Sequence, residues 1–314
     1  MKKILLLGAN GQVGFELART LAPLGELQVA TRDGLLATGE HCLHADLANP
    51  ETLDAALHAA APDIVVNAAA YTAVDRAEDE ENLADRINHW ALTVLGAWAA
   101  RSGALVVHYS TDYVFNGAAR HPYREDDPTA PLGVYGRTKL AGEDALRASG
   151  CDHLILRTAW VFAARGHNFL RTMLRLARER DELRIVDDQR GAPTAAGTIA
   201  SATAQALSLW LAWDGQARDA AIGTYHLCAG GQCSWFEFAQ AIVASAKRAG
   251  LVDRVPAVVP IATADYPTRA RRPAWSVLDT TKFRTAFSLK LPDWEQGLDA
   301  VIGELAAAGR RDSR

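Results

Sequence analysis

Short apolar runs alternate with longer helix-forming segments through the first 160 residues, and this alternation predicts the main elements of the fold. The apolar runs indicate five buried strands, at 4–7, 27–30, 64–66, 105–108 and 154–156. The segments between them indicate helices at 12–21, 50–60, 79–101 and 136–148. Because strands that are apolar along their whole length must be covered on both faces, we expect an α/β fold with a Rossmann-type doubly wound parallel sheet.

The alternation loosens after residue 158, and proline and turn residues become frequent, most of all over 255–272. Helix patterns continue at 168–180, 198–213 and 235–249, with possible strands at 183–186 and 225–227. A chain of 314 residues suits two lobes around one cleft, so we expect a smaller C-terminal substrate lobe. The predicted division is a dinucleotide-binding domain at 1–160 with a return segment near 190–228, a substrate-binding lobe at 161–189 and 229–308, and a frayed tail at 309–314.

Composition limits the partners and the cellular compartment that we expect, but it does not identify a function. The formal net charge of −4 gives no general attraction to nucleic acid or to an anionic membrane. The four cysteines lack the paired spacing of a metal site, which favours reduced structural thiols in a cytoplasmic protein. The apolar run near the N-terminus ends at Gly8, too early for a signal peptide, and no apolar stretch reaches the roughly 20 residues that span a bilayer.

A glycine-rich turn follows the first predicted strand and opens the first helix, with Gly8, Gly11 and Gly14 spaced as G-x-x-G-x-x-G. Glycines permit a tight turn and a close approach of the backbone to a pyrophosphate, and the helix N-terminus favours the anion. A glycine triplet alone also fits an ordinary turn. Its position between a strand and a helix favours a dinucleotide site.

The next strand ends indicate where the rest of a dinucleotide would lie. Arg32 and Asp33 follow the second strand: the arginine suits a 2′-phosphate, and the aspartate suits a free ribose. We expect NADPH, with NADH as the alternative and solvated loop charges as the competing interpretation of both residues. Asp46 and Leu47 precede a helix where such folds often contact adenine, and small residues that include Ala69 and Ala70 end the third strand.

Tyr135 and Lys139 lie four positions apart on a predicted helix and therefore share one face. Carbonyl reduction needs an acid beside the oxygen, and a nearby ammonium favours the phenolate and brings the pKa of a phenol closer to neutrality. Thr111 ends the fourth strand, at the sheet edge where open α/β sheets bind ligands, so we expect it to hydrogen-bond the substrate oxygen. A structural strand cap is the other interpretation of Thr111.

These motifs sit in longer runs that resemble the dTDP-4-dehydrorhamnose reductase family of the extended short-chain dehydrogenases/reductases. The similar runs are GANGQVGFEL at 8–17, VVNAAAYTAVDRAE at 65–78, VVHYSTDYVFNG at 106–117, VYGRTKLAGE at 134–143, DDQRGAPT at 187–194 and YPTRARRPAWSVL at 266–278. The resemblance implies reduction of dTDP-4-dehydro-L-rhamnose to dTDP-L-rhamnose, the last step in making that activated sugar.

The resemblance also implies roles for single residues. Tyr135 would be the proton donor, Lys139 its electrostatic partner and Thr111 a carbonyl ligand. Asp112 and Trp160 would hold the sugar, although a tryptophan after a strand is by default a core residue. The implied cofactor positions are Gly11, Gln12, Val13, Asp46, Leu47, Ala70, Tyr71, Thr72, Tyr109, Tyr135 and Lys139.

A nucleoside diphosphate needs cationic partners, and three arginines lie in the proline-bounded loop at 267–273. We expect Arg272 to meet the diphosphate or to support that loop. Some members of the resembled family are magnesium-dependent dimers joined through three glutamates. Glu16 and Glu304 fill two of those positions, but the third falls at Gly197, so we expect no metal and a monomer or weak homodimer.

Two other functions remain open on the sequence. A sugar-nucleotide epimerase or dehydratase would share the fold, but a dehydratase commonly has an acidic pair beside the catalytic threonine, and here Asp112 stands alone before Tyr113. A non-enzymatic regulatory subunit would be free to lose the acid–base residues, which this chain retains. The favoured partner is therefore a small-molecule dTDP-sugar rather than nucleic acid or membrane.

Overall fold

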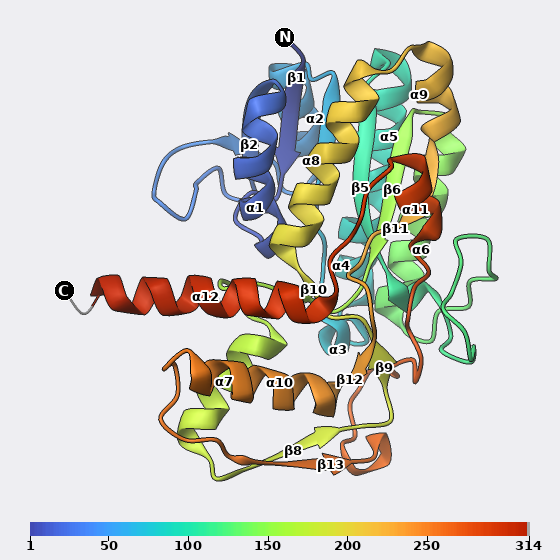
Figure 1. Ribbon diagram of the computed structural model, residues 1–314. Helices are drawn as coiled ribbons and strands as arrows, with labels where there is room; N and C mark the ends of the chain where they lie inside the picture. The colour runs from blue at the N-terminus through green and yellow to red at the C-terminus, as the bar shows by residue number, and fades with distance from the viewer. Residues whose placement is uncertain (313–314) are drawn as a thin grey trace.

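The computed structural model describes residues 1–312, with side chains described through residue 309, and its centre is one parallel sheet of seven strands (Figure 1). The strand order is β11-β6-β5-β4-β1-β2-β3. These strands are β1 (Lys3–Leu7), β2 (Glu26–Thr31), β3 (Leu43–His44), β4 (Ile64–Asn67), β5 (Leu105–Thr111), β6 (His153–Thr158) and β11 (Gly223–His226). The predicted Rossmann-type parallel sheet is confirmed, and all its pairings are parallel.

Helices cover both faces of the sheet, as the fully apolar strands require. One face packs against α1 (Gln12–Leu21), α8 (Ala196–Ala212), α9 (Gly215–Ala221) and α11 (Thr281–Ala286). The other face packs against α2 (Pro50–Ala60), α5 (Ala91–Ser102) and α6 (Val134–Ser149). Alternate residues of β1 enter the two cores, Leu6 on the first face and Leu5 on the second.

The long helix expected at 79–101 contains a widened turn. It consists of α4 (Glu81–Asp85), a π-helical segment (Arg86–Trp90) and α5, preceded by α3 (Val74–Ala77). Asn88 lies buried in the π-helical turn, where its carbonyl faces Gly142 of α6; a Cβ on that glycine would lie 2.1 Å from the carbonyl oxygen. Such turns are frequent at functional sites, and this one packs directly against the helix that carries Tyr135 and Lys139.

The second lobe has its own apolar core below the sheet in Figure 1. Its helices are α7 (Phe169–Glu179), α10 (Trp235–Arg248) and α12 (Trp294–Asp312). Its strands are β8 (Glu182–Val186) paired with β13 (Ala257–Ile261), β7 (Val161–Phe162) with β10 (Thr194–Ala195), and β9 (Arg190–Gly191) with β12 (Cys233–Ser234). Short 3-10 turns occur at Ala22–Leu24, Asp112–Val114 and Thr263–Asp265. Helix α12 lies between the two lobes (Figure 1).

The C-terminal third departs from the expected division in three places. A strand, β13, forms inside the proline-rich stretch because β8 offers it a parallel partner. Residues 281–291 return to the first lobe, where Phe283 and Phe287 join the core beneath β11. Helix α12 continues through Asp312 rather than ending in a frayed tail at 309, and residues 313–314 of that tail lie outside the described residues.

Two features of the described chain bear on its surroundings. No helix within residues 1–312 is both long enough and apolar enough to cross a bilayer. The four cysteines are free thiols, and three of them are buried.

Candidate active site

The glycine turn after β1 is built so that side chains are excluded from it. Gly8 has φ of +83°, and a Cβ there would lie 2.8 Å from the backbone nitrogen of Ala69. A Cβ on Gly14 would lie 2.1 Å from the carbonyl oxygen of Gly8. Gly11 is the N-cap of α1 and offers no side-chain cap, so the first-turn amides stay available for an anion. These residues fit a dinucleotide pyrophosphate.

The two residues that open α1 attach the turn to the rest of the protein through their side chains. Gln12 accepts a hydrogen bond of 2.7 Å from Asn168 Nδ2, which links the turn to the N-terminus of α7 in the second lobe. Val13 packs against the core of the first lobe. Contacts of these positions with a pyrophosphate would therefore run through their backbone amides.

Arg32 and Asp33, the two charged residues that follow β2, have different surroundings. Asp33 accepts hydrogen bonds from the Thr31 hydroxyl at 3.0 Å and from the Leu35 amide at 3.3 Å, and these bonds lower the pKa of its carboxyl. The Arg32 side chain is exposed. The aspartate thus stabilises the turn, while the arginine remains accessible to a 2′-phosphate.

The expected adenine and ribose positions lie at neighbouring strand ends. Asp46 accepts a hydrogen bond of 3.0 Å from the Ala48 amide, and Leu47 is buried in the core beneath β2. Tyr71 donates its hydroxyl proton to Glu80 Oε2 at 2.7 Å, while its backbone is held by the side chain of Asn88. Three further positions in this region are partly or fully accessible: Ala69, Ala70 and Thr72.

Lys139 is almost fully buried, at 1% exposure, and its ammonium position is defined by two partners. Its Nζ donates to the carbonyl oxygen of Tyr109 at 2.7 Å and lies 3.1 Å from Nε2 of His108. Burial lowers the pKa of Lys139 from 10.5 to about 7, against the opposing charge of Glu143. The Tyr109 hydroxyl points into the core and pairs with Thr203 at 2.8 Å, so Tyr109 acts on this site through its carbonyl and not through its ring.

Tyr135, in the first turn of α6, lies near Thr111 at the end of β5. Burial raises the pKa of Tyr135 to about 12, the Asp112 carboxylate acts in the same direction, and the Thr111 side chain opposes them. The expected lowering of the phenol pKa by Lys139 is therefore wrong for the protein without cofactor. The reason is geometric: the lysine amine is directed at Tyr109 and His108 rather than at the phenol.

Asp112 follows Thr111 directly and is buried. Its Oδ1 accepts a hydrogen bond of 3.0 Å from the Thr111 hydroxyl, and its Oδ2 is buried without a hydrogen-bond partner. Burial raises the pKa of Asp112 from 3.8 to about 6. Thr111 also accepts from the Tyr113 amide at 3.2 Å, so it acts as a strand cap as well as a neighbour of Tyr135.

Trp160 has an unusual backbone and a ring held between lobes. Its φ of +47° is uncommon for a residue with a side chain. Its indole stacks on Trp235, with ring centroids 3.5 Å apart and an interplanar angle of 4°. A Cβ on Gly191 would lie 2.4 Å from the Trp160 ring, so the glycine makes room for the indole. Trp160 is partly exposed and is not an interior core residue.

The arginine-rich loop is tied to α3 and its surroundings. Arg272 forms a two-point ion pair with Asp75, with N–O distances of 2.7 and 3.2 Å. Arg269 pairs with Asp79. The structure thus supports the loop-supporting interpretation of Arg272, and its contact with a diphosphate stays a prediction.

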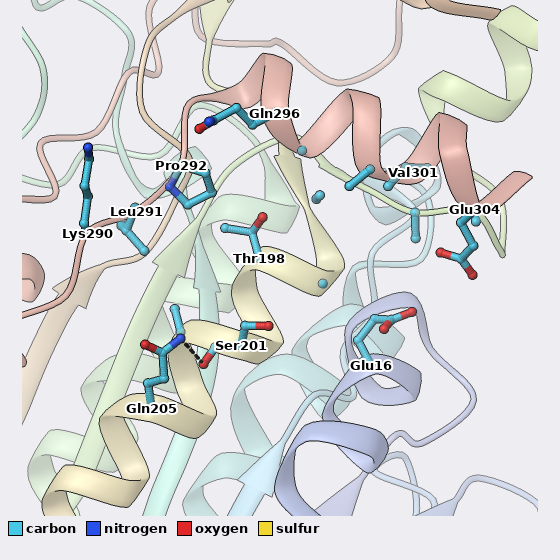
Figure 2. Close-up of a pocket in the computed structure, with 17 residues that line it drawn as sticks. Glu16, Thr198, Ser201, Gln205, Lys290, Leu291, Pro292, Gln296, Val301 and Glu304 are labelled. Atoms are coloured by element: carbon cyan, nitrogen blue, oxygen red, sulfur yellow. Dashed lines mark hydrogen bonds between the residues drawn. The ribbon is translucent and has the colours of Figure 1, made fainter. Parts of the chain in front are cut away.

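The residues that the resemblance relates to magnesium line a separate cavity of about 400 Å³ between α1, α8 and α12. Figure 2 shows Glu16 and Glu304 on opposite helices of this cavity. Burial and the charge of Glu304 raise the pKa of Glu16. Gly197 lines the same cavity, and among the described side chains no group of three histidine, cysteine or carboxylate residues is arranged to hold a metal ion. The metal-free state and the oligomeric state stay predictions.

Two polar residues in the first lobe were missed by the sequence interpretation. His108 is fully buried in β5 and contacts Lys139. Asn67 ends β4 and contacts His108, with Asn67 Nδ2 3.2 Å from His108 Nδ1. A histidine inside the run Leu-Val-Val-His-Tyr-Ser-Thr is a signal that was available, because a polar side chain in a strand buried on both faces needs a partner.

Comparison with known proteins agrees with this geometry. The family model described as the RmlD substrate binding domain matches residues 1–307. A dTDP-4-dehydrorhamnose reductase of Burkholderia thailandensis is 50% identical over 305 residues, covering 96% of this chain and 99% of the relative. A crystal structure of the Clostridium acetobutylicum dTDP-4-dehydrorhamnose reductase aligns with a TM-score of 0.83 at 33% identity, covering 96% of this chain and 99% of that one.

A second solved structure was determined with a dinucleotide. The dTDP-4-dehydrorhamnose reductase of Bacillus anthracis in complex with NADP aligns with a TM-score of 0.82 at 32% identity, covering 97% of this chain and 100% of that one. The expected family is thereby confirmed by sequence and by fold. With its glycine turn, its Thr-Tyr-Lys cluster and full-length similarity to these oxidoreductases, this chain belongs to the dTDP-4-dehydrorhamnose reductase family.

Proposed function

We propose that this protein reduces dTDP-4-dehydro-L-rhamnose to dTDP-L-rhamnose with NADPH, as the last step in making the activated sugar. The observation that carries the proposal is the position of Thr111 at the carboxyl end of β5, beside the first turn of α6 that carries Tyr135, where the Thr111 side chain acts on the phenol. Asn67 and Ala69 lie between the glycine turn and His108, which precedes Thr111 on the same strand. Carbonyl reduction requires this juxtaposition of proton donor and dinucleotide site.

The dinucleotide would be held by the glycine turn and the neighbouring strand ends. Arg32 and Asp33 are both exposed, but Asp33 already accepts two hydrogen bonds within its own turn, whereas Arg32 carries a positive charge that suits a 2′-phosphate, which supports NADPH over NADH. The residues proposed to contact the cofactor are Gly8, Gly11, Gln12, Val13, Gly14, Arg32, Asp46, Leu47, Ala69, Ala70, Tyr71, Thr72, Tyr109, Tyr135 and Lys139. When bound, a reduced nicotinamide supplies hydride to C4 of the sugar.

The protein's own residues supply the proton and the orientation. Thr111 holds the carbonyl oxygen, and Tyr135 gives that oxygen its proton. The raised pKa of Tyr135, about 12, keeps the phenol protonated at neutral pH until a strongly basic alkoxide oxygen develops beside it. The Lys139 side chain is fixed beside the site by its hydrogen bond to the carbonyl oxygen of Tyr109.

The substrate would lie between the lobes, in contact with Asp112, Trp160 and Arg272. The unpartnered Asp112 Oδ2 suits a sugar hydroxyl, and the partly exposed indole of Trp160, with its unusual backbone conformation, packs against two apolar cores, one of which is the core of the second lobe. Arg272 places a cation nearby, which suits a diphosphate. As part of the same proposal the protein acts in the cytoplasm, which agrees with its four free thiols.

The test is turnover of dTDP-4-dehydro-L-rhamnose, followed by nicotinamide absorbance with NADPH and with NADH. Replacing Tyr135 with Phe removes the proton donor while keeping the ring, and we expect kcat to fall by about 10²- to 10⁴-fold. Dinucleotide affinity, measured by fluorescence titration, should change little. A Tyr135→Phe protein with unchanged kcat, or a wild-type protein without turnover on this substrate, would overturn the proposal.

A further inference from the structure

Lys139 is the end of a chain of hydrogen-bonding groups that crosses two strands. Its Nζ lies 3.1 Å from His108 Nε2, and His108 Nδ1 lies 3.2 Å from Asn67 Nδ2. The Asn67 Oδ1 accepts the Ala69 amide proton at 3.1 Å. His108, Asn67 and Lys139 each have at most 1% of their surface exposed, so water does not offer these groups alternative partners.

The direction of each hydrogen bond in this series of groups follows from the Ala69 amide, because that amide can act only as a donor. A backbone amide only donates, so the Ala69 amide requires the oxygen of Asn67 on its side and the NH₂ group on the histidine side. The NH₂ group only donates, so His108 Nδ1 must accept. A neutral imidazole that accepts at Nδ1 carries its proton on Nε2, which then points at Lys139 Nζ.

We propose that Asn67 and His108 form a positioning pair that holds Lys139 as a neutral amine in the protein before cofactor binds. An ammonium has no lone pair and cannot accept the Nε2 proton, whereas an amine accepts it and still donates to the Tyr109 carbonyl. The pair therefore selects the uncharged form of the lysine by hydrogen-bond direction.

The charged groups around Lys139 are consistent with this selection. Burial lowers the pKa of His108 well below 6.5, so the imidazole stays neutral whether Lys139 is an amine or an ammonium. On α6, Glu143 favours the ammonium, but Arg157 of β6 pairs with it at 2.7 and 2.9 Å, and Arg147 adds a further contact at 3.1 Å.

The remaining titratable neighbours are the active-site groups at the carboxyl end of β5. Tyr135 lies one turn before Lys139 on α6 and stays protonated because its pKa is raised to about 12. Asp112 pairs with Thr111 rather than with the lysine. Burial is the largest influence on Lys139 and lowers its pKa to about 7, in the same direction as the hydrogen-bond argument.

The consequence for catalysis rests on the proposed function. An amine beside the nicotinamide site can take up a proton from solvent when the active site fills, and its hydrogen bond from His108 Nε2 breaks as it does so. The resulting ammonium would be the cation that stabilises a Tyr135 phenolate after proton transfer. His108 and Asn67 do not touch substrate in this scheme. They set the proton affinity of Lys139 and therefore the pH at which this lysine gains or loses its proton.

The direct test is the tautomer of His108 in the free protein, read by long-range ¹H–¹⁵N correlation NMR with a His108→Gln sample to assign its signals. We expect a protonated Nε2 and an unprotonated Nδ1. A proton on Nδ1 would overturn the proposal. This measurement needs no cofactor, substrate or turnover, so its result stands apart from that of the proposed function.

A second measurement follows the titration of Lys139 itself. The chain has six lysines, and Lys139 alone is buried, so its ¹³Cε signal is assignable. In His108→Gln the amide is free to turn its oxygen toward Nζ, and we expect the Lys139 midpoint to rise by about one pH unit. The matched control is His226→Gln, at an equally buried histidine two strands away on β11, which should leave the midpoint unchanged.

Activity offers an independent readout of the same shift. The pH dependence of kcat/KM reports groups of the free enzyme, so its lysine-dependent limb should move upward in His108→Gln and not in His226→Gln. An unmoved Lys139 midpoint in folded His108→Gln contradicts the proposal, whatever the rate of turnover.

Discussion

Replacing Lys139 with Met should reveal the free energy of burying this lysine, because the two side chains are similar in length and unbranched while only the lysine carries a proton. The side chain is 1% exposed, so solvent screening is minimal. Removal of the amine also takes away the hydrogen-bond partner that Lys139 gives to the Tyr109 carbonyl and to His108 Nε2. Such losses cost about 1–3 kcal/mol each and do not vary with pH, because neither group titrates near neutrality.

The pH-dependent part of the effect follows from the pKa values. The pKa of Lys139 is about 7 in the folded protein against an ordinary 10.5, so between these values the unfolded chain binds more protons than the folded protein. Wild-type stability therefore rises with pH across this window, and the variant lacks that gain. Between pH 7 and pH 9 the difference amounts to about 2 kcal/mol, at about 1.4 kcal/mol per pKa unit.

The assay is urea unfolding of wild type and Lys139→Met at pH 7, 8 and 9, followed by circular dichroism. All other titrating groups are common to both proteins, so the difference in unfolding free energy isolates the lysine. We expect that difference to move by about 2 kcal/mol in favour of wild type as the pH rises. Differences that stay constant across the three pH values would refute a lowered lysine pKa.

Two further predictions concern the cofactor and the substrate. Arg32→Ala should weaken NADPH binding about tenfold or more, by loss of a charge-assisted hydrogen bond, and leave NADH binding nearly unchanged in fluorescence titration; equal loss for both cofactors would contradict the 2′-phosphate assignment. Gly191→Ala places a Cβ 2.4 Å from the Trp160 ring and should displace the indole from Trp235, raising the sugar-nucleotide KM in steady-state kinetics without changing dinucleotide affinity.

The first lobe was largely predictable because its signals are local. An apolar strand followed by a glycine turn and a helix pattern is encoded within about 20 residues, and the predicted strand and helix agree closely with β1 and α1. The four-residue spacing of Tyr135 and Lys139 likewise places both on α6 without reference to the rest of the chain.

The C-terminal part was less predictable because its elements depend on distant partners. The strand β13 exists through its pairing with β8, more than 70 residues earlier in the chain. The role of Arg272 depends on Asp75, which lies 197 positions away, and nothing near Arg272 in sequence indicates that partner. The hydrophobic pattern of such segments is irregular because their structure depends on contacts with distant residues, which local periodicity does not encode.

The sequence by itself determined the fold class, the glycine turn between β1 and α1, and the positions of Thr111, Tyr135 and Lys139 on their strand and helix, because residue type and short spacing specify these. Only the tertiary structure decided the protonation chemistry of these three residues. The pKa of Tyr135 and of Lys139 depends on burial and on partners from β4 and β5, and Ala69, Asn67 and His108 come to Lys139 through the register of neighbouring strands. Charge states are set by surroundings, and the surroundings form only when the chain has folded.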